Sequence, residues 1–225
     1  MRWEHLLFLH WPIDPAVLRP HIPKELEIET FQGHAWIGVV PFLMAATRFR
    51  CLPPVRIADR FLECNLRTYV RDPSGSHPGV WFFSLDAESW LAVAGARMGF
   101  GLPYFNAKMK CQQEGGRVDY SMERADRRGP LATFDASWRE TAPPQVAAPQ
   151  SLEQFLAERY CLYTRCRGKL LRGDIEHEPW QLAPAEVDLR QLDMTRLLDY
   201  SIEEAPASVL AAQPLDVVAK ALVRA

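Results

Sequence analysis

The sequence predicts a mainly β (α+β) fold, an antiparallel barrel or sandwich with a few peripheral helices. Three observations support this prediction. Polar and apolar residues alternate with a period of two along most segments, turn residues separate these segments at short intervals, and few segments have a helical pattern. The chain has 225 residues, 48% of them hydrophobic, and can bury one full core without disulfide bonds or metal ions. Residues 1–225 are therefore expected to form a single domain.

The alternation places strands at eight positions along the first two thirds of the chain. They are residues 4–11, 26–31, 35–42, 60–70, 79–87, 107–113, 117–124 and 131–140. The turns at 32–34 and 114–116 contain glycine, and each predicts a hairpin between the strands that flank it. A longer turn, rich in proline, glycine and serine, separates the strands 60–70 and 79–87.

Two segments are predicted to be helical. Residues 89–98 are short and apolar and stop near two glycines. Ser151, with Gln154 three residues later, resembles a capping box that opens a helix running to about residue 159. The segment 141–150 before it reads as a loop, too short to link two domains.

Composition excludes several classes of function. The net charge is -2 and no basic stripe is present, so no nucleic-acid partner is expected. The N-terminus is polar and no apolar run is long enough to span a bilayer, so we expect neither a signal peptide nor a membrane partner. The five cysteines are an odd number without a C-x-x-C pair, which indicates free thiols and a cytoplasmic location, with no metal site. Phosphate-loop and dinucleotide motifs are absent, so no cofactor is expected.

The strand at 61–70 has one unusual face. Alternation puts Glu63, Asn65 and Arg67 in a row on that face, between Phe61 and Tyr69, while the other face is an ordinary apolar one. An acid, an amide and a guanidinium between aromatic residues are typical of the lining of a partly buried cavity. Arg67 there could hold Glu63 ionised and bind a carboxylate bidentately. The alternative is a solvated outer face with a Glu–Arg pair along the strand, worth under about 1 kcal/mol.

The following strand, 79–87, is apolar on both faces until its end and is expected to be buried on both sides. Strict alternation puts Ser84 and Asp86 on the face of Phe82. Asp86 then either forms a carboxylate pair with Glu63, or caps the next helix, which we favour. Ser84 lacks the G-x-S-x-G context of a serine hydrolase.

Residues 102–110 form the second distinctive segment. In an extended conformation Tyr104, Lys108 and Lys110 face the same way, and a buried Lys108 could form a Schiff base with a carbonyl compound. Two lysines on a solvated strand end are the favoured alternative. Arg97, near the end of the preceding helix, either contributes to a binding site or stabilises the helix dipole.

His10 is the best placed of the six histidines, because it lies in an apolar strand next to Trp11. A satisfied core histidine is the favoured interpretation, and a functional histidine is the alternative. His177, beside Pro179 and Trp180, is open to the same two interpretations.

Five ordered segments together resemble a known family. They are His10-Trp11, Gly33 to Gly38 with Pro41-Phe42, Glu63 to Val70, Pro78 to Asp86 and Leu102-Pro103-Tyr104. They look like the YqjF-like family, a domain of unknown function (2071) found in bacterial proteins and similar in fold to acetoacetate decarboxylase. The resemblance covers most of the chain and is strongest over residues 1–110.

The resemblance implies an antiparallel barrel around a central cavity, but it does not carry the decarboxylase chemistry with it. The decarboxylase has its Schiff-base lysine directly after a glycine-aromatic-proline turn. The comparable turn here is Gly101-Leu102-Pro103, and the next residue is Tyr104. The lysine that serves as electron sink is therefore missing, unless Lys108 replaces it from a shifted position.

Three hypotheses about function follow. In the favoured one, the protein binds a small polar molecule with a carboxylate or carbonyl group. The sequence leaves open whether the protein forms a homo-oligomer. In the second, a lyase or hydrolase acts in the same cavity, with Glu63 as acid/base and Tyr104 or His10 as proton partner. In the third, the polar face is an ion-pair network that fixes strand register, and the function lies in a protein partner. The candidate ligand-binding residues are Trp11, Asn65, Arg67, Trp81, Phe83, Ser84, Asp86, Arg97 and Lys108.

Overall fold

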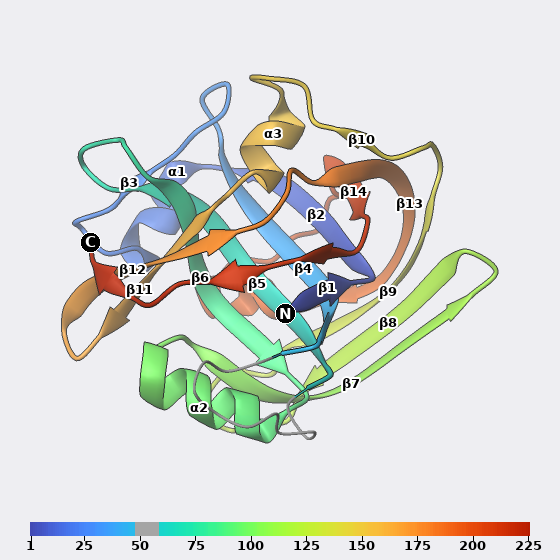
Figure 1. Cartoon of the computed structure of the whole chain (residues 1–225), viewed down its shortest axis with the longest axis horizontal. Coiled ribbons are helices and arrows are strands. Elements are labelled where there is room, and N and C mark those ends of the chain that lie inside the picture. Colours follow the sequence, from blue (N-terminus) through green and yellow to red (C-terminus); the bar gives the residue numbers. More distant parts are fainter. Residues whose placement is uncertain (48–58) are drawn as a thin grey trace.

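The fold is built on a closed ring of strands, seen in a computed structural model that describes residues 1–47 and 59–225 (Figure 1). Nine of the described strands pair in the order β2–β4–β5–β6–β7–β8–β9–β13–β14 and back to β2. All of these pairs are antiparallel except β6–β7. The ring strands are β2 (Leu6–Ile13), β4 (Ala35–Ala45), β5 (Phe61–Arg71), β6 (Pro78–Ala87), β7 (Tyr104–Glu114), β8 (Arg117–Arg124), β9 (Thr133–Glu140), β13 (Gln181–Leu192) and β14 (Ser208–Ala212).

Shorter elements complete the chain around the ring. The remaining strands are β1 (Arg2–Glu4), β3 (Glu27–Ile28), β10 (Gln145–Val146), β11 (Cys161–Cys166), β12 (Lys169–Glu176), β15 (Leu215–Asp216), β16 (Val218–Ala219) and β17 (Val223–Arg224). The helices are α1 (Pro15–Leu18), η1 (Arg19–His21), α2 (Trp90–Phe100), α3 (Leu152–Ala157) and η3 (Met194–Leu198). Figure 1 shows α2 and α3 at opposite ends of the central strands.

Two apolar cores lie on the two faces of strands β2, β4 and β5. The first fills the ring, because it takes side chains from β7, β8 and β9 as well as from these three strands. The second core lies on the outer face, where β1, α3 and Trp180 cover it. Since both faces are covered, β5 is buried on both sides for most of its length. The predicted barrel is therefore confirmed, with a packed interior and a second core outside it.

Most of the predicted elements are present, with some changes of partner and extent. The hairpin of 107–113 and 117–124 is confirmed as β7–β8. The hairpin predicted across 32–34 is wrong, because β3 pairs with β5 rather than β4, and an isolated bridge between Phe31 and His34 closes the turn. Ser151 caps α3 as predicted, by accepting from the backbone N–H of Gln154 at 3.2 Å, although α3 ends at Ala157. The strands after residue 160 were not predicted.

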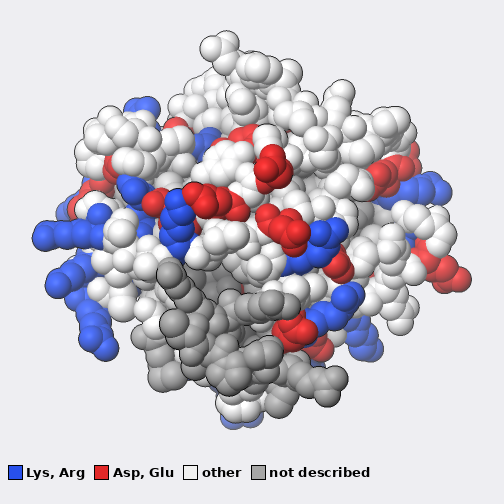
Figure 2. Space-filling model, in the orientation of Figure 1, with Lys and Arg blue, Asp and Glu red and all other residues white. Residues whose placement is uncertain are grey.

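Acidic and basic side chains are interspersed on the face in Figure 2. The described cysteines, Cys64, Cys111, Cys161 and Cys166, are free, and Cys51 lies outside the described residues. Among the residues that the structure describes, no group of three or more His, Cys, Asp or Glu side chains is arranged to hold a metal ion. Within the same residues, none of the helices has the length and apolar character needed to cross a membrane.

Candidate functional site

The polar row of β5 lies in the second core, away from bulk solvent. Glu63 is 2% exposed and Asn65 4% exposed, and Arg67 is half-buried. The alternative of a solvated outer face is therefore wrong. The row is placed by its neighbours, because β4 pairs with β5 on one side and β6 pairs with it on the other.

Glu63 is held by two neutral groups rather than by a cation. The Tyr104 hydroxyl donates to Glu63 Oε2 at 2.8 Å, and the Asn65 side chain also hydrogen-bonds to the carboxylate. Burial raises the pKa of Glu63 to about 7, against the lowering effect of these two hydrogen bonds. Burial likewise raises the pKa of Tyr104 well above its ordinary value. Near neutral pH, Glu63 can thus release or accept a proton, while Tyr104 stays protonated.

Arg67 is a cation that has no carboxylate partner among the residues described by the structure. Its Nη2 donates to the Leu156 carbonyl at 3.2 Å and to the Tyr69 hydroxyl at 3.4 Å, and its guanidinium lies 5.2 Å from the centre of the Phe8 ring. No acidic group of the described residues lies within 4.0 Å of it, and its Nε has no hydrogen-bond partner. The expected Glu63–Arg67 pair is therefore absent.

His10 is fully buried and paired with Tyr69. His10 Nε2 lies 2.5 Å from the Tyr69 hydroxyl oxygen. Burial, helped by the charge of Arg67, holds the pKa of His10 well below its ordinary value, so the ring is neutral. Because Arg67 donates to the Tyr69 oxygen, the Tyr69 hydroxyl proton is free to bond to Nε2. This network assigns the imidazole proton to Nδ1, which has no partner.

Gly38 makes room for the His10–Tyr69 pair. It lies between His10 and Arg67 in the sheet, and a Cβ at this position would come within 3.0 Å of His10 Cδ2 and 3.4 Å of the Tyr69 oxygen. Real Cβ atoms rarely approach so closely, so only glycine leaves the imidazole ring in its present position.

Three polar atoms without a hydrogen-bond partner thus lie on one face of the sheet. His10 and Arg67 lie on either side of Gly38 across the strands, and Asn65 lies two residues before Arg67 on β5. His10 Nδ1 and Arg67 Nε are donors, and Asn65 Oδ1 is an acceptor. Buried polar atoms are nearly always hydrogen-bonded, so these three atoms are the positions on this face at which a further hydrogen-bonding group could be accommodated. We refer to His10, Glu63, Asn65, Arg67 and Tyr104 as the polar cluster. Its apolar surroundings include Phe8, Val40, Phe42, Leu85, Ala157 and Trp180.

Several predicted wall residues lie elsewhere. Trp11 belongs to the core inside the ring, and Trp81 and Phe83 pack against that core. The residue of β2 that faces the polar cluster is instead Phe8, and on β6 it is Phe82, directly opposite Arg67. Trp11, Trp81 and Phe83 are therefore separated from the cluster by the sheet itself.

A β-bulge explains the positions of Ser84 and Asp86. The register of β5–β6 shifts so that Arg67 pairs with Phe82 but Leu66 pairs with Ser84, leaving Phe83 as the extra residue. Ser84 and Asp86 therefore face away from Phe82, and the prediction of a shared face is wrong. Asp86 accepts bonds from Arg124 Nε at 2.6 Å and Nη2 at 2.7 Å, a partner that was not predicted.

The basic candidates also lie outside the polar cluster. Lys108 and Lys110 are exposed, as in the favoured alternative, since the face that they share with Tyr104 is open to solvent further along β7. A lysine in a shifted Schiff-base position is therefore not present. Arg97, in the last turn of α2, donates to the Tyr104 carbonyl and to Asp126 Oδ2. It therefore holds the backbone of Tyr104.

Two residues near the cluster were not given a role in the sequence. Tyr69 was noted only as an aromatic flank, although its place two residues after Arg67 puts it on the same face. Gly38 belongs to a segment used for the family resemblance, and a glycine inside an alternating strand is a sign of close approach by another group.

His177 stacks on Tyr160, with ring centres 4.6 Å apart, and packs against Trp180.

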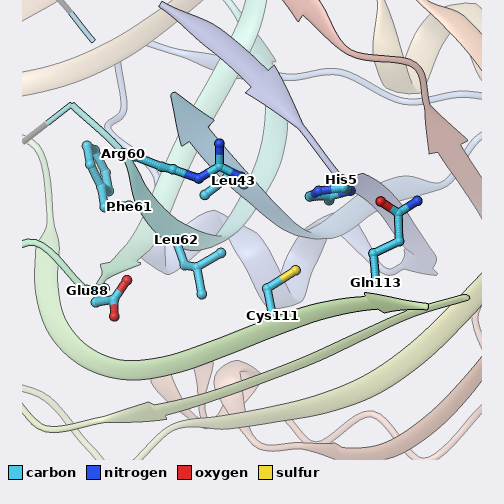
Figure 3. Close-up of a pocket in the computed structure, with 8 residues that line it drawn as sticks. All are labelled: His5, Leu43, Arg60, Phe61, Leu62, Glu88, Cys111 and Gln113. Atoms are coloured by element: carbon cyan, nitrogen blue, oxygen red, sulfur yellow. The ribbon is translucent and has the colours of Figure 1, made fainter. Parts of the chain in front are cut away.

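Two surface pockets are distinct from the polar cluster. The one in Figure 3, about 280 Å³ in volume, lies at one end of β4 and β5. Burial raises the pKa of the Cys111 thiol there to about 11, so the thiol stays protonated, and Arg60 pairs with Glu4 at 3.6 Å. Neither pocket includes a member of the polar cluster. The Figure 3 pocket is lined by His5, Leu43, Arg60, Phe61, Leu62, Glu88, Cys111 and Gln113.

Comparison with known proteins identifies the family of this chain. Residues 1–216 match the model of DUF2071, a family of uncharacterised conserved proteins. The chain belongs to this family. It is also 45% identical over 187 residues to the uncharacterised protein YqjF of Bacillus subtilis, covering 83% of this chain and 76% of YqjF.

Solved structures share the fold at low sequence identity. The enduracididine biosynthesis enzyme MppR superposes with a TM-score of 0.67 and 12% identity, over 99% of this chain and 87% of MppR. Acetoacetate decarboxylase from Legionella pneumophila superposes with a TM-score of 0.61 and 13% identity, over 99% of this chain and 86% of the enzyme. An acetoacetate decarboxylase-like enzyme from Sphingomonas wittichii gives a TM-score of 0.64 and 11% identity, over 100% and 91% of the two chains. The fold of this DUF2071 protein is therefore that of acetoacetate decarboxylase.

Proposed function

We propose that this protein binds a small molecule bearing a carboxylate or carbonyl group at the polar cluster. The observation that carries the proposal is the half-buried Arg67, which has no carboxylate partner among the described residues and an unpartnered Nε–H. A guanidinium that is partly removed from solvent favours an anionic partner, and it binds planar oxyanions particularly well.

The neighbouring groups suit the same kind of ligand. The Nδ1–H of His10 supplies a second donor for a carbonyl or carboxylate oxygen, and Asn65 Oδ1 can accept from a hydroxyl group. Phe8, on which the Arg67 guanidinium lies, supplies an apolar wall. Arg67 is the half-buried member of the cluster, so a ligand would enter beside it.

The structural relatives support a small carboxylate as the first molecule to test. MppR has been solved in complex with pyruvate and in complex with the condensation product of pyruvate and imidazole 4-carboxaldehyde. Pyruvate combines the carboxylate and the carbonyl group that the polar cluster would bind. We therefore use pyruvate as the probe.

The binding proposal is tested by calorimetric titration of pyruvate into the wild type and the Arg67→Gln variant. We expect saturable binding to the wild type and at least a tenfold weaker Kd in the variant. The matched control is Arg139→Gln, which removes an exposed arginine paired with Glu186 at 3.8 Å and is expected to bind like the wild type. Equal affinity of all three proteins would contradict the proposal.

A second candidate function is catalysis of proton transfer on the bound molecule, with Glu63 as acid/base. The observation that favours it is the pKa of about 7 for Glu63, next to the Tyr104 hydroxyl at 2.8 Å. In this scheme the Glu63 carboxylate takes a proton from the carbon beside the ligand carbonyl, and the enolate oxygen is stabilised by Arg67. The same carboxyl group then returns a proton to that carbon.

The catalytic candidate is tested by proton NMR of pyruvate in deuterated buffer. If Glu63 transfers protons, the methyl signal of pyruvate decays by deuterium exchange with the wild type and much more slowly with Glu63→Gln. A decay rate that is the same with both proteins would exclude Glu63 as the base. Borohydride should trap no lysine adduct in either protein, because Lys108 and Lys110 are exposed on β7.

A further inference from the structure

A second pocket, of about 310 Å³, lies at a fork in the sheet. On one edge, β6 pairs with β11 as far as Trp81 and with β7 only from Leu85 onward. Among the described strands none pairs with Phe82–Ser84 on this edge. The pocket occupies the fork, between the end of β11 and the start of β7.

Aromatic side chains form the walls of this pocket. Trp81 and Phe83 come from β6, Tyr163 from β11 and His21 from η1. The His21 ring meets the Phe83 ring edge-on, with centres 6.4 Å apart at 88°. Trp81 and Phe83 are half-buried although both are large aromatic residues, so part of each ring remains available at the pocket surface.

The β-bulge directs Phe83 toward this pocket. Phe83 is the extra residue of the bulge, and it packs on the same side of the sheet as Trp81. Bulges are frequent beside binding sites because they re-aim a side chain in this way. The bulge therefore gives the pocket two aromatic walls from a single strand.

The opposite side of the pocket is fixed by the turn before β7. Gly101 adopts a φ of +65°, and a Cβ there would lie 2.8 Å from the Cβ of Cys166, so only glycine lets the turn pack on β11. The Thr164 hydroxyl donates to the Gly101 carbonyl at 3.0 Å. These contacts hold the turn before β7 against β11, so the two strands that border the pocket are fixed relative to each other.

The polar groups at the pocket are few. Arg165 is engaged by both oxygens of Glu25, at 2.7 and 2.8 Å, and so is not free to hold an anion. The His21 ring has no hydrogen-bond partner within the described parts of the chain. A ligand here would meet aromatic faces and one imidazole, with no free charge of either sign.

We propose that this pocket binds a small, uncharged, planar aromatic molecule that carries one N–H or O–H group. Its ring would lie against Trp81 and Phe83, and its polar hydrogen would bond to the His21 ring. The volume is at the lower end of the range for small-molecule sites, which fits a molecule of one or two fused rings. The proposal does not depend on the function proposed for the polar cluster.

The experiment is a saturation-transfer NMR titration with indole, using cyclohexanol as a hydroxylated, non-aromatic probe. We expect indole to bind saturably and cyclohexanol not to bind. Trp81→Leu and Phe83→Leu should each weaken indole binding at least tenfold. Trp90→Leu is the matched control, since Trp90 is 63% exposed and lies outside the pocket, and Arg67→Gln tests independence from the polar cluster. Both should bind indole like the wild type.

A second measurement uses only the wild-type protein, so it does not depend on the folding of any variant. In carbon-13 methyl spectra, indole should shift the signals of Leu197 and Leu198, which line the pocket, through ring currents. It should leave Leu182 and Leu210, in the second core, unchanged. Equal binding of indole and cyclohexanol, unchanged binding in the pocket variants, or shifts confined to Leu182 and Leu210 would overturn the proposal.

Discussion

Two arginines on opposite faces of the same sheet, the buried Arg124 and the half-buried Arg67, differ in how they are paired. Arg124 and Asp86 have fully buried side chains and form two hydrogen bonds to each other. Arg124 also donates to the Pro130 carbonyl and lies 4.1 Å from the centre of the Phe105 ring. Within the described part of the chain, Arg67 on the other face has no carboxylate partner, and its Nε is unpartnered. Breaking the Arg124–Asp86 pair would leave an uncompensated buried charge, whereas the half-buried Arg67 has no built-in counter-ion among the described residues, and the binding proposal rests on this difference.

The largest expected loss of stability follows from breaking the buried Arg124–Asp86 pair. Asp86→Asn removes the negative charge and leaves Arg124 buried with its charge uncompensated, which should lower the free energy of unfolding by about 3–5 kcal/mol. Urea denaturation measures this change. Asp119→Asn is the matched control, because Asp119 pairs with Arg117 at the surface, and it should change stability by less than about 1 kcal/mol. Similar losses in both variants would mean that the buried pair has no special role.

The next effect depends on pH and concerns Glu63. Because burial raises its pKa from 4.5 to about 7, the stability it contributes is present below pH 4.5 and is lost as pH rises through 7. Between pH 5 and pH 8 the wild type should therefore lose up to about 3 kcal/mol relative to Glu63→Gln. His10 has a lowered pKa and acts in the opposite direction at low pH, but it is present in both proteins and cancels in the difference. Parallel pH profiles of the two proteins would show that Glu63 titrates normally.

A smaller effect is expected at Gly38. In Gly38→Ala the new Cβ would press on the His10 ring, so the variant should lose about 1–3 kcal/mol of stability and weaken the His10–Tyr69 bond. Gly95→Ala is the control, since Gly95 lies in α2 with nothing within 4 Å, and alanine should stabilise that helix by up to about 1 kcal/mol. Thermal unfolding measures both changes, and a gain of stability in Gly38→Ala would refute the close packing.

The smallest effect is expected when Arg67 itself is replaced. Arg67→Leu loses two long hydrogen bonds but leaves no carboxylate unpaired, so stability should change by less than about 1 kcal/mol. This contrasts with the loss expected for Asp86→Asn. Urea denaturation of the two variants side by side tests the comparison, and a loss above about 3 kcal/mol in Arg67→Leu would assign Arg67 a structural role.

Local alternation was sufficient to predict the polar row but not its partners. The period-two pattern put Glu63, Asn65 and Arg67 on one face, and the structure agrees. The same pattern was wrong for Ser84 and Asp86, because a bulge adds one residue and reverses the faces beyond it. The strand 117–124, which supplies Arg124, was predicted. The pairing of Asp86 with Arg124 spans 38 residues, however, and follows only from the packing of β8.

The C-terminal third was the least predictable part of the chain. Strand β13 alternates between more and less exposed residues, but Pro184 interrupts it and most of its residues are not fully buried. Its role in closing the ring depends on pairing with β9 and β14. Such long-range pairing leaves little trace in local sequence.

The central claim is that the unpartnered Arg67 Nε–H binds an oxygen atom of a ligand. NMR observes this N–H group directly. In a nitrogen-15 spectrum of arginine side chains, the Arg67 Nε–H signal is assigned by its loss in Arg67→Gln. The probes to be added in turn are acetate, pyruvate, acetoacetate and benzoate. We predict that at least one shifts this signal saturably and leaves the Arg124 signal unchanged. An Arg67 signal that stays in place with all four carboxylates would contradict the claim.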